Sequence, residues 1–79
     1  MKLSKAMQIR INNLLREHNL SRYSLSIQAG ISPSVLTDFY SGKTTYLRID
    51  SILHICEGFD IDLEEFFADD IFKNVDAEK

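Results

Sequence analysis

The strongest constraint on the fold is a very short connection between two predicted helices in the middle of the chain. Gly30 ends the first of them, and only Gly30, Ile31 and Ser32 separate it from the next. Ser32 followed by Pro33 is a typical helix start, because the hydroxyl can cap the helix and proline occupies the helical position where a missing amide costs nothing. So short a connection forces the two helices to cross at a steep angle, which is the geometry of a helix-turn-helix.

Apolar residues recur at helical spacing on both sides of this connection and predict an all-α fold of five helices. The first helix begins near Leu3 and ends near His18, with Asn19 as a left-handed stop. Ser21 caps the second, Gly42 ends the third, the fourth ends around residues 58–60, and Asp62 and Glu65 have the spacing of a capping box for a short fifth. The positions predicted to face inward are Leu3, Met7, Ile11, Leu14, Leu15, Leu25, Ser26, Ala29, Leu36, Phe39, Ile49, Ile52, Leu53, Cys56, Leu63, Phe66 and Phe67.

The size of the chain predicts one hydrophobic core. Its 79 residues are 44% hydrophobic, and so short a chain cannot support two cores. We expect one domain over residues 1–67 and an acidic C-terminal tail over residues 68–79, either partly helical or involved in dimerisation. No apolar run approaches the roughly 20 residues that span a bilayer, and no apolar signal region follows Met1. These features, with the single Cys56, indicate a soluble cytoplasmic protein in a reducing compartment.

Charge is distributed unevenly along the chain. Residues 1–48 hold seven basic and two acidic side chains, a balance of +5, whereas residues 49–79 hold two basic and ten acidic ones, a balance of −8. The net charge of −3 would argue against a nucleic-acid partner, but the asymmetry favours a basic half that faces nucleic acid and an acidic back. Two solvated faces of unrelated charge are the alternative.

The sequence gives little support for catalysis or for a bound metal or cofactor. His18 and His54 lie far apart, and neither forms a zinc pattern with Cys56. Asp50, His54 and Glu57 share one side of the fourth predicted helix, but helical spacing often produces such polar triplets. We therefore expect no enzyme, no metal site and no cofactor.

The segment Leu20–Gly42, LSRYSLSIQAGISPSVLTDFYSG, resembles the helix-turn-helix of the Cro and lambda-repressor family. The resemblance covers roughly residues 9–67 and includes a small residue in the second helix, the turn residues and the short closing helix. Its matching positions are Leu25, Ser26, Ala29, Gly30, Ile31, Ser32, Leu36, Phe39, Gly42, Lys43 and the segment 61–67. The resemblance implies a five-helix lambda-repressor-like DNA-binding domain with a central helix-turn-helix.

The chain departs from the family pattern at three positions. Many members pair a partly buried arginine of the first helix with a glutamate near the end of the third, where this chain has Leu15 and Tyr40. Replacing both partners avoids a lone buried charge, so we expect Leu15 and Tyr40 to touch. Arg22 stands where the family usually has a glutamine that bonds a phosphate, and it either takes over that contact with a full charge or faces solvent.

The resemblance implies a set of DNA contacts, with the third helix in the major groove. By this resemblance, the residues expected to contact bases are Pro33, Ser34, Thr37 and Asp38. Those expected to contact phosphates are Arg10, Arg22, Ser32, Lys43 and Thr44. The base-reading set is unusual because it holds no arginine, lysine, glutamine or asparagine for bidentate contacts, so DNA shape is expected to carry part of the specificity. For the serines and threonines, helix capping is the alternative role.

The leading hypothesis is a sequence-specific regulator, a repressor of transcription, that binds a palindrome in double-stranded DNA as a homodimer. The apolar residues Phe66, Phe67, Ile71 and Phe72 serve either to close the core or to contact the partner subunit. The rival is an adaptor or antitoxin-like module with the same fold that binds a basic protein through its acidic C-terminal half or the helix bearing Asp38. A continuous basic surface around the third helix would favour DNA, and interruption by carboxylates would favour the rival. Asp38 either reads bases or marks the loss of DNA binding.

Overall fold

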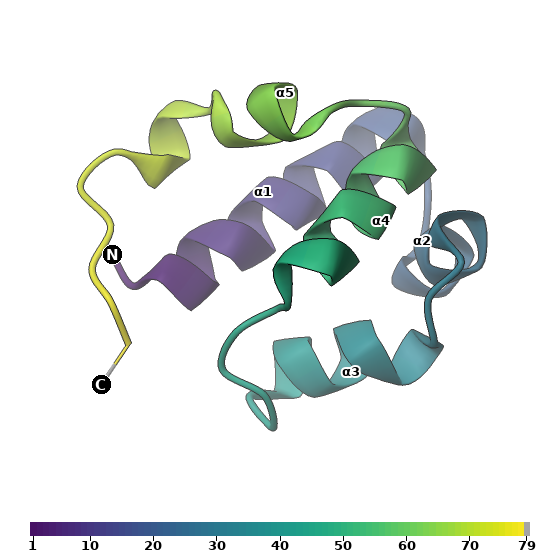
Figure 1. The fold of residues 1–79 in the computed structure, drawn as a ribbon, viewed down its shortest axis with the longest axis horizontal. Coiled ribbons are helices and arrows are strands. Elements are labelled where there is room, and N and C mark those ends of the chain that lie inside the picture. Colours follow the sequence, from purple (N-terminus) through teal and green to yellow (C-terminus); the bar gives the residue numbers. More distant parts are fainter. Residues whose placement is uncertain (79) are drawn as a thin grey trace.

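The computed structural model describes residues 1–78, which form five α-helices and one 3₁₀ helix with no named strand (Figure 1). The helices are α1 (Leu3–His18), α2 (Arg22–Ala29), α3 (Pro33–Ser41), α4 (Ile49–Phe59) and α5 (Leu63–Phe67), followed by the 3₁₀ helix Asp70–Phe72. The predicted all-α fold of five helices is confirmed. In the described part of the chain, no helix is long and apolar enough to cross a membrane.

Most of the predicted helix ends are confirmed. The sequence predicts them well because helix ends depend on hydrogen bonds between residues close together in the chain. Asn19, Gly30 and Gly42 adopt the left-handed conformation directly after α1, α2 and α3. The side chain of Ser21 accepts from the Ser24 amide at 3.0 Å, and that of Asp62 accepts from the Glu65 amide at 2.8 Å. Each cap satisfies backbone groups that the end of a helix leaves without partners.

Ser32 differs from the prediction. It precedes α3 in an extended conformation, as an N-cap residue does, but its side chain makes no capping hydrogen bond to the helix. Its hydroxyl lies 3.0 Å from the hydroxyl of Ser34 instead. Pro33 stands at the first position of α3, so proline marks the start of this helix without a side-chain cap.

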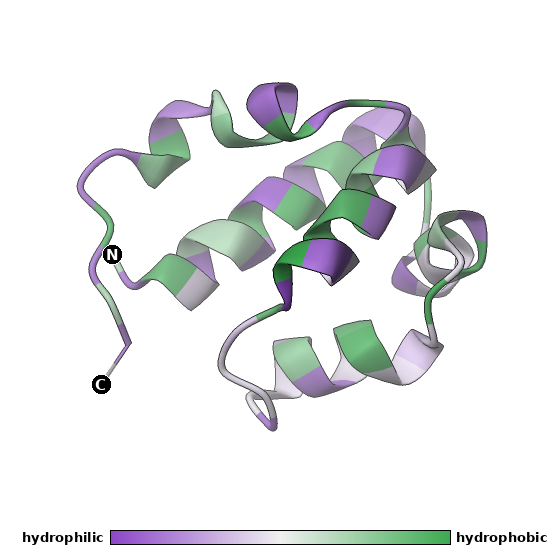
Figure 2. Ribbon diagram, in the orientation of Figure 1, coloured by the Kyte–Doolittle hydropathy of each residue, from purple (hydrophilic) through white to green (hydrophobic). Residues whose placement is uncertain are grey.

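The core lies where α1, α4 and the helix-turn-helix meet. Apolar and polar segments alternate along α1 and α4 (Figure 2). Three phenylalanines, Phe39, Phe59 and Phe66, are almost fully buried within the core. α2 packs against both α3 and α4, and α4 packs against α5. This packing fixes α3 along one edge of the molecule, away from α5 (Figure 1).

The predicted apolar stripe of α4 is partly wrong. Ile52 and Cys56 are buried, but the side chains of Ile49 and Leu53 are exposed. Ile55 and Phe59 are buried instead, which shifts the covered side of α4 away from Ile49 and Leu53. The other helices therefore pack against the side of α4 that carries Ile55 and Phe59, and they leave the apolar side chains of Ile49 and Leu53 uncovered.

The C-terminal segment returns to the start of α1. Asp76 forms a parallel bridge with Lys2, in which its carbonyl accepts from the Leu3 amide at 2.9 Å. The Glu78 carboxylate accepts from the Ser4 amide at 2.7 Å, and the Glu78 amide donates to the Tyr46 hydroxyl at 2.9 Å. Residues 68–78 therefore contact the domain, and the 3₁₀ helix makes this segment partly helical.

Candidate nucleic-acid interface

The turn between α2 and α3 has the compact geometry that the sequence predicts. Gly30 takes a φ of 70°, a conformation that glycine adopts without strain, and the Ile31 amide donates to the Ser26 carbonyl at 3.0 Å. Ser26 is fully buried, so its small side chain lies inside the helix-turn-helix, and its hydroxyl donates to the Tyr23 carbonyl at 2.6 Å. Ile31 packs against the core and anchors the turn.

The four residues predicted to read bases lie together on one side of α3. Pro33, Ser34 and Thr37 are exposed, and Asp38 is half-buried. The Thr37 hydroxyl donates to the Pro33 carbonyl at 3.2 Å, which leaves the oxygen's lone pairs as acceptors. This side of α3 therefore presents small polar groups and one carboxylate.

A shallow groove runs beside these residues, between α3 and the segment that leads into α4. Its lining comprises Ser34, Val35, Asp38, Thr44, Tyr46, Leu47, Arg48 and Ser51. The Thr44 amide donates to the Asp38 carbonyl at 3.2 Å, so this segment is tied to α3. Three of the predicted contact residues, Ser34, Asp38 and Thr44, thus share one groove.

Arg48 is a groove residue that the sequence reasoning missed. Its side chain is 82% exposed, and its Nε and Nη2 donate to the two carboxylate oxygens of Asp50 at 3.0 and 3.2 Å. These bonds hold the pKa of Asp50 below its usual range. A basic residue shortly after Lys43 and Thr44 was the available signal. Its ion pair with Asp50 also shows that carboxylates interrupt the basic surface around α3.

Arg22, Lys43 and Thr44 are exposed around this surface, as a phosphate-contacting role requires. The guanidinium carbon of Arg22, at the start of α2, lies 3.6 Å from the centre of the Tyr40 ring. Such stacking is a favourable cation–π contact, and it leaves the N–H groups at the edge of the guanidinium. Arg22 therefore lies against α3, with its charge at the surface.

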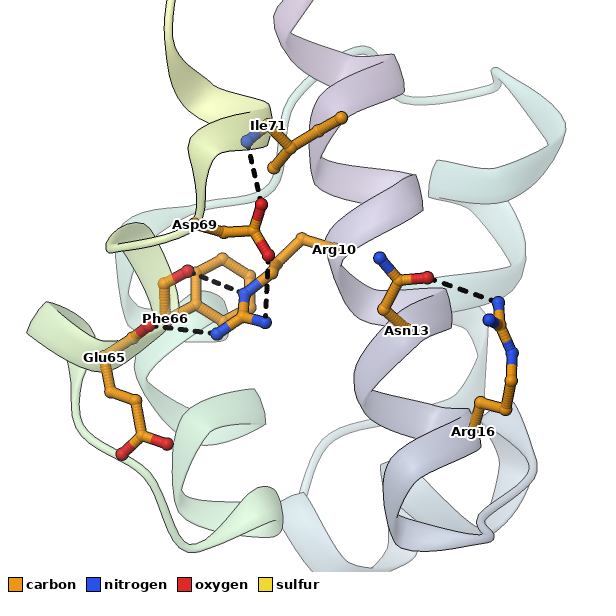
Figure 3. A network of polar contacts seen from close by, with 7 residues as sticks. All are labelled: Arg10, Asn13, Arg16, Glu65, Phe66, Asp69 and Ile71. Carbon is orange, nitrogen blue, oxygen red and sulfur yellow. Dashed lines mark hydrogen bonds and ion pairs between the residues drawn. The ribbon is translucent and has the colours of Figure 1, made fainter.

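Arg10 does not belong to this surface, and its assignment as a phosphate contact is corrected. It is buried, and its side chain reaches α5 and the segment after it (Figure 3). Nε donates to the Phe66 carbonyl at 2.9 Å, Nη2 to the Glu65 carbonyl at 3.0 Å, and Nη1 pairs with Asp69 at 3.4 Å. With its donors engaged inside the protein, Arg10 has a structural role.

Tyr40 joins α3 to α1 and α2. Its hydroxyl donates to the Asn12 side-chain oxygen at 2.8 Å, and the Arg22 guanidinium stacks on its ring. Tyr40 packs against the core cluster that contains Leu15. A direct contact between Leu15 and Tyr40 stays a prediction.

The groups considered for catalysis or metal binding do not form a centre in residues 1–78. Nδ1 of His54 lies 3.2 Å from the carboxylate of Glu57 on the exposed side of α4. The described residues contain no cluster of three or more histidine, cysteine or acidic side chains that could hold a metal ion. Burial raises the pKa of the Cys56 thiol to about 11, so at neutral pH it is a protonated core group.

Comparison with known proteins adds one finding. Residues 10–70, more than half of the chain, match the family model described as "Cro/C1-type HTH DNA-binding domain". Neither the curated proteins nor the solved structures give a match. The matched range includes α2, α3, the groove and α5.

Proposed function

The chain belongs to the family of Cro/C1-type helix-turn-helix DNA-binding domains, and from this premise we propose that it represses transcription by inserting α3 into the major groove of double-stranded DNA. One observation carries the proposal. α3 follows a turn of three residues and carries small polar groups on one side. In the sequence, the exposed cation Arg22 precedes α3 and the exposed cation Lys43 follows it.

The base-reading residues are Pro33, Ser34, Thr37 and Asp38. Asp38 accepts hydrogen bonds and therefore suits the amino group of a cytosine, whereas Pro33 suits the methyl group of a thymine. Ser34 and Thr37 bond several base edges without fixing base identity. This set gives modest direct readout, so sequence-dependent DNA shape supplies the remaining specificity.

The phosphate contacts are Arg22, Ser32, Lys43 and Thr44. The cations supply most of the affinity, because neutralising phosphates releases counterions from the DNA. The hydroxyls and the amides of the first turn of α3 fix the position of the protein on the duplex. Arg48 joins this set when it exchanges Asp50 for a phosphate.

We propose that the protein binds a palindrome as a homodimer, with its two recognition helices about 34 Å apart. Phe67 is the residue of the C-terminal apolar set that stays exposed, at 39%, whereas Phe66 is fully buried. The Phe66 ring meets the Phe67 ring edge to face and lies beside the Phe72 ring, and Phe66 and Phe72 close the core. The exposed part of Phe67 is the candidate subunit contact.

Binding of a basic protein partner is the second candidate function, and one observation favours it. The carboxylates of Asp38 and Asp50 lie beside cations on the same side of the molecule, so the surface around α3 is of mixed charge. Repulsion between carboxylates and phosphates weakens DNA binding, whereas a partner bearing lysines or arginines would gain from both groups.

Selection of DNA ligands from random-sequence and genomic pools, at two salt concentrations, tests the DNA-binding function. We expect enriched sequences whose affinity falls steeply as salt rises. Arg22→Ala and Lys43→Ala should each weaken binding to all sequences and lower the salt slope by about 1. Thr37→Ala and Asp38→Ala should instead change which sequences are enriched.

Lys73→Ala is the matched control, because Lys73 is an exposed cation that pairs with Asp70 in the C-terminal segment. It removes the same charge as Lys43→Ala, and we expect nearly unchanged DNA affinity. If the folded wild-type protein binds no DNA at low salt, the DNA-binding proposal is wrong, and cross-linking to a basic protein partner becomes the next measurement.

A further inference from the structure

We propose that Tyr40 positions Arg22 for a DNA phosphate, so that a ring on α3 orients a cation on α2. This inference rests on the proposed DNA-binding function. It makes Tyr40 a positioning residue that acts through Arg22 and touches no DNA itself. The aromatic ring thus gives an exposed arginine a defined place at the interface.

The geometry of the stack leaves Arg22 ready to bind an anion. A guanidinium whose carbon lies 3.6 Å from a ring centre contacts the ring through its flat side. Its N–H groups point outward in the guanidinium plane, and among the described residues no hydrogen bond or ion pair engages them. Two of these donors match the oxygens of one phosphate.

Tyr40 is itself fixed, which makes its ring a firm support. Its hydroxyl donates to Asn12 on α1 at 2.8 Å and lies 3.5 Å from the carbonyl of Gln8. The half-buried side chain packs against the core cluster. Because the ring cannot turn freely, the stacked Arg22 loses fewer conformations on binding DNA than a solvated arginine would.

The charge state of Tyr40 suits this role. Burial raises its pKa to about 12, and the nearby positive charge of Arg22 lowers it only in part. The phenol is therefore neutral throughout the pH range used for DNA binding. It offers Arg22 the face of an aromatic ring, with no negative charge to compete with a phosphate.

A double-mutant cycle tests the inference with the DNA sequence selected above. Arg22→Ala, Tyr40→Leu and the double variant are compared with the wild type by DNA affinity at several salt concentrations and by urea unfolding. We expect each single variant to weaken binding about two- to fivefold or more and to lower the salt slope. The double variant should bind scarcely more weakly than Arg22→Ala, because the two residues act as one unit.

Tyr40→Phe keeps the ring and is the rescue control. It should lose some stability but bind DNA within about twofold of the wild type. If Tyr40→Leu does not fold, phenylalanines carrying successive ring fluorines at position 40 replace it, because fluorine weakens the attraction of the ring for a cation with little change in shape. DNA affinity should then fall stepwise when Arg22 is present and stay constant in the Arg22→Ala background.

Two results overturn the inference while the DNA-binding function stands. In one, the wild type binds DNA and Arg22→Ala binds equally well. In the other, Arg22→Ala weakens binding, but removing or fluorinating the Tyr40 ring changes neither the affinity nor the salt slope. A folded wild type that binds no DNA overturns the proposed function, and this inference fails with it.

Discussion

The Arg10 side chain brings a positive charge into the interior between α1 and α5. Its guanidinium donates to two backbone carbonyls, those of Glu65 and Phe66, and pairs with the partly exposed carboxylate of Asp69. The same group lies 5.7 Å from the centre of the Phe66 ring. These contacts close the C-terminal part of the fold over α1 (Figure 3).

Replacing Arg10 with methionine should destabilise the protein without changing its electrostatic attraction to DNA. The substitution removes the donor to the Phe66 carbonyl, leaves the Glu65 carbonyl with the Ala68 amide alone, and takes from Asp69 its cationic partner while the Ile71 amide still donates to it. We expect the free energy of unfolding to fall by about 2–3 kcal/mol in urea denaturation. The DNA salt slope should match that of the wild type, whereas Arg22→Ala should lower it. An Arg10→Met protein as stable as the wild type would contradict this role.

The contrast between Arg10 and Arg22 shows that the order of residues in the sequence does not reveal the surroundings of a single side chain. Both look like surface cations on amphipathic helices. The acceptors of Arg10 lie 55 and 56 residues away in the chain, and two of its three bonds are to backbone carbonyls, which no side-chain pattern reveals. Arg22 is on the surface as predicted, but its stacking on Tyr40 depends on how α2 and α3 cross.

Burial of Cys56 makes stability depend on pH in the alkaline range. The folded thiol has a pKa of about 11, above the value of about 8.5 for an unfolded chain. This raised pKa gives stability that is complete below pH 8.5 and is lost as the pH rises toward 11. Between pH 8 and 9.5 we expect unfolding by urea to become easier by about 1 kcal/mol. A Cys56→Ala variant, less stable at every pH, should show a smaller decline, and parallel declines would refute the assignment.

At the scale of elements, Gly58 allows α4 to approach α2 closely. A Cβ atom at this position would lie 3.1 Å from Leu25 Cδ1 and 3.2 Å from both Cβ and the backbone nitrogen of Ala29. The Leu25 methyl group can adjust, but the backbone of α2 cannot move without disturbing the helix-turn-helix. Glycine is here a packing residue inside a helix, although it lowers helix propensity.

Gly58→Ala should therefore lower the free energy of unfolding by about 1 kcal/mol. Overpacking costs about 1–3 kcal/mol and outweighs the gain of about 1 kcal/mol in helix propensity. His54→Ala, on the exposed side of α4, serves as the propensity control, and Gly58→Ser should be at least as damaging as Gly58→Ala. Chemical denaturation measures all three, and a Gly58→Ala protein more stable than the wild type would show that the helices separate easily.

The sequence predicts where helices begin and end better than which side of a helix is covered. Asn19, Gly30 and Asp62 act on backbone groups within a few residues, so their patterns suffice. Ile49 and Leu53 have helical spacing and apolar side chains, but burial depends on which neighbours reach them. No local pattern contains that information.

In the whole molecule, α3 lies away from the acidic α5, but the C-terminal segment returns to the groove beside α3. α3 and the groove lie along one edge, and α5 lies on the opposite side, over α4 and α1 (Figure 1). The segment after α5 returns past the start of α1, where the Glu78 amide donates to the hydroxyl of Tyr46, a residue that lines the groove. Buried Arg10 and the pairing of Arg48 with Asp50 reduce the positive charge available to DNA below what the sequence count suggests.

The contact between Glu78 and the first turn of α1 leads to the last prediction. The Glu78 carboxylate accepts from the Ser4 amide in the first turn of α1, where a helix favours negative charge. The hydrogen bond to Ser4 lowers the pKa of Glu78 below its usual value. A lowered pKa gives stability that is present above the unfolded value of about 4.3 and is lost as the pH falls through the folded value.

Glu78→Gln should therefore lower the melting temperature slightly at pH 7, and the difference from the wild type should shrink as the pH falls below 4. The Ser4 amide of the wild type should also exchange with solvent more slowly at pH 7 than that of the variant, because the carboxylate protects it. Glu64→Gln, on the exposed side of α5, is the matched control. An equal melting temperature and equal Ser4 exchange in the wild type and Glu78→Gln would mean that the C-terminal segment does not hold α1 through this carboxylate.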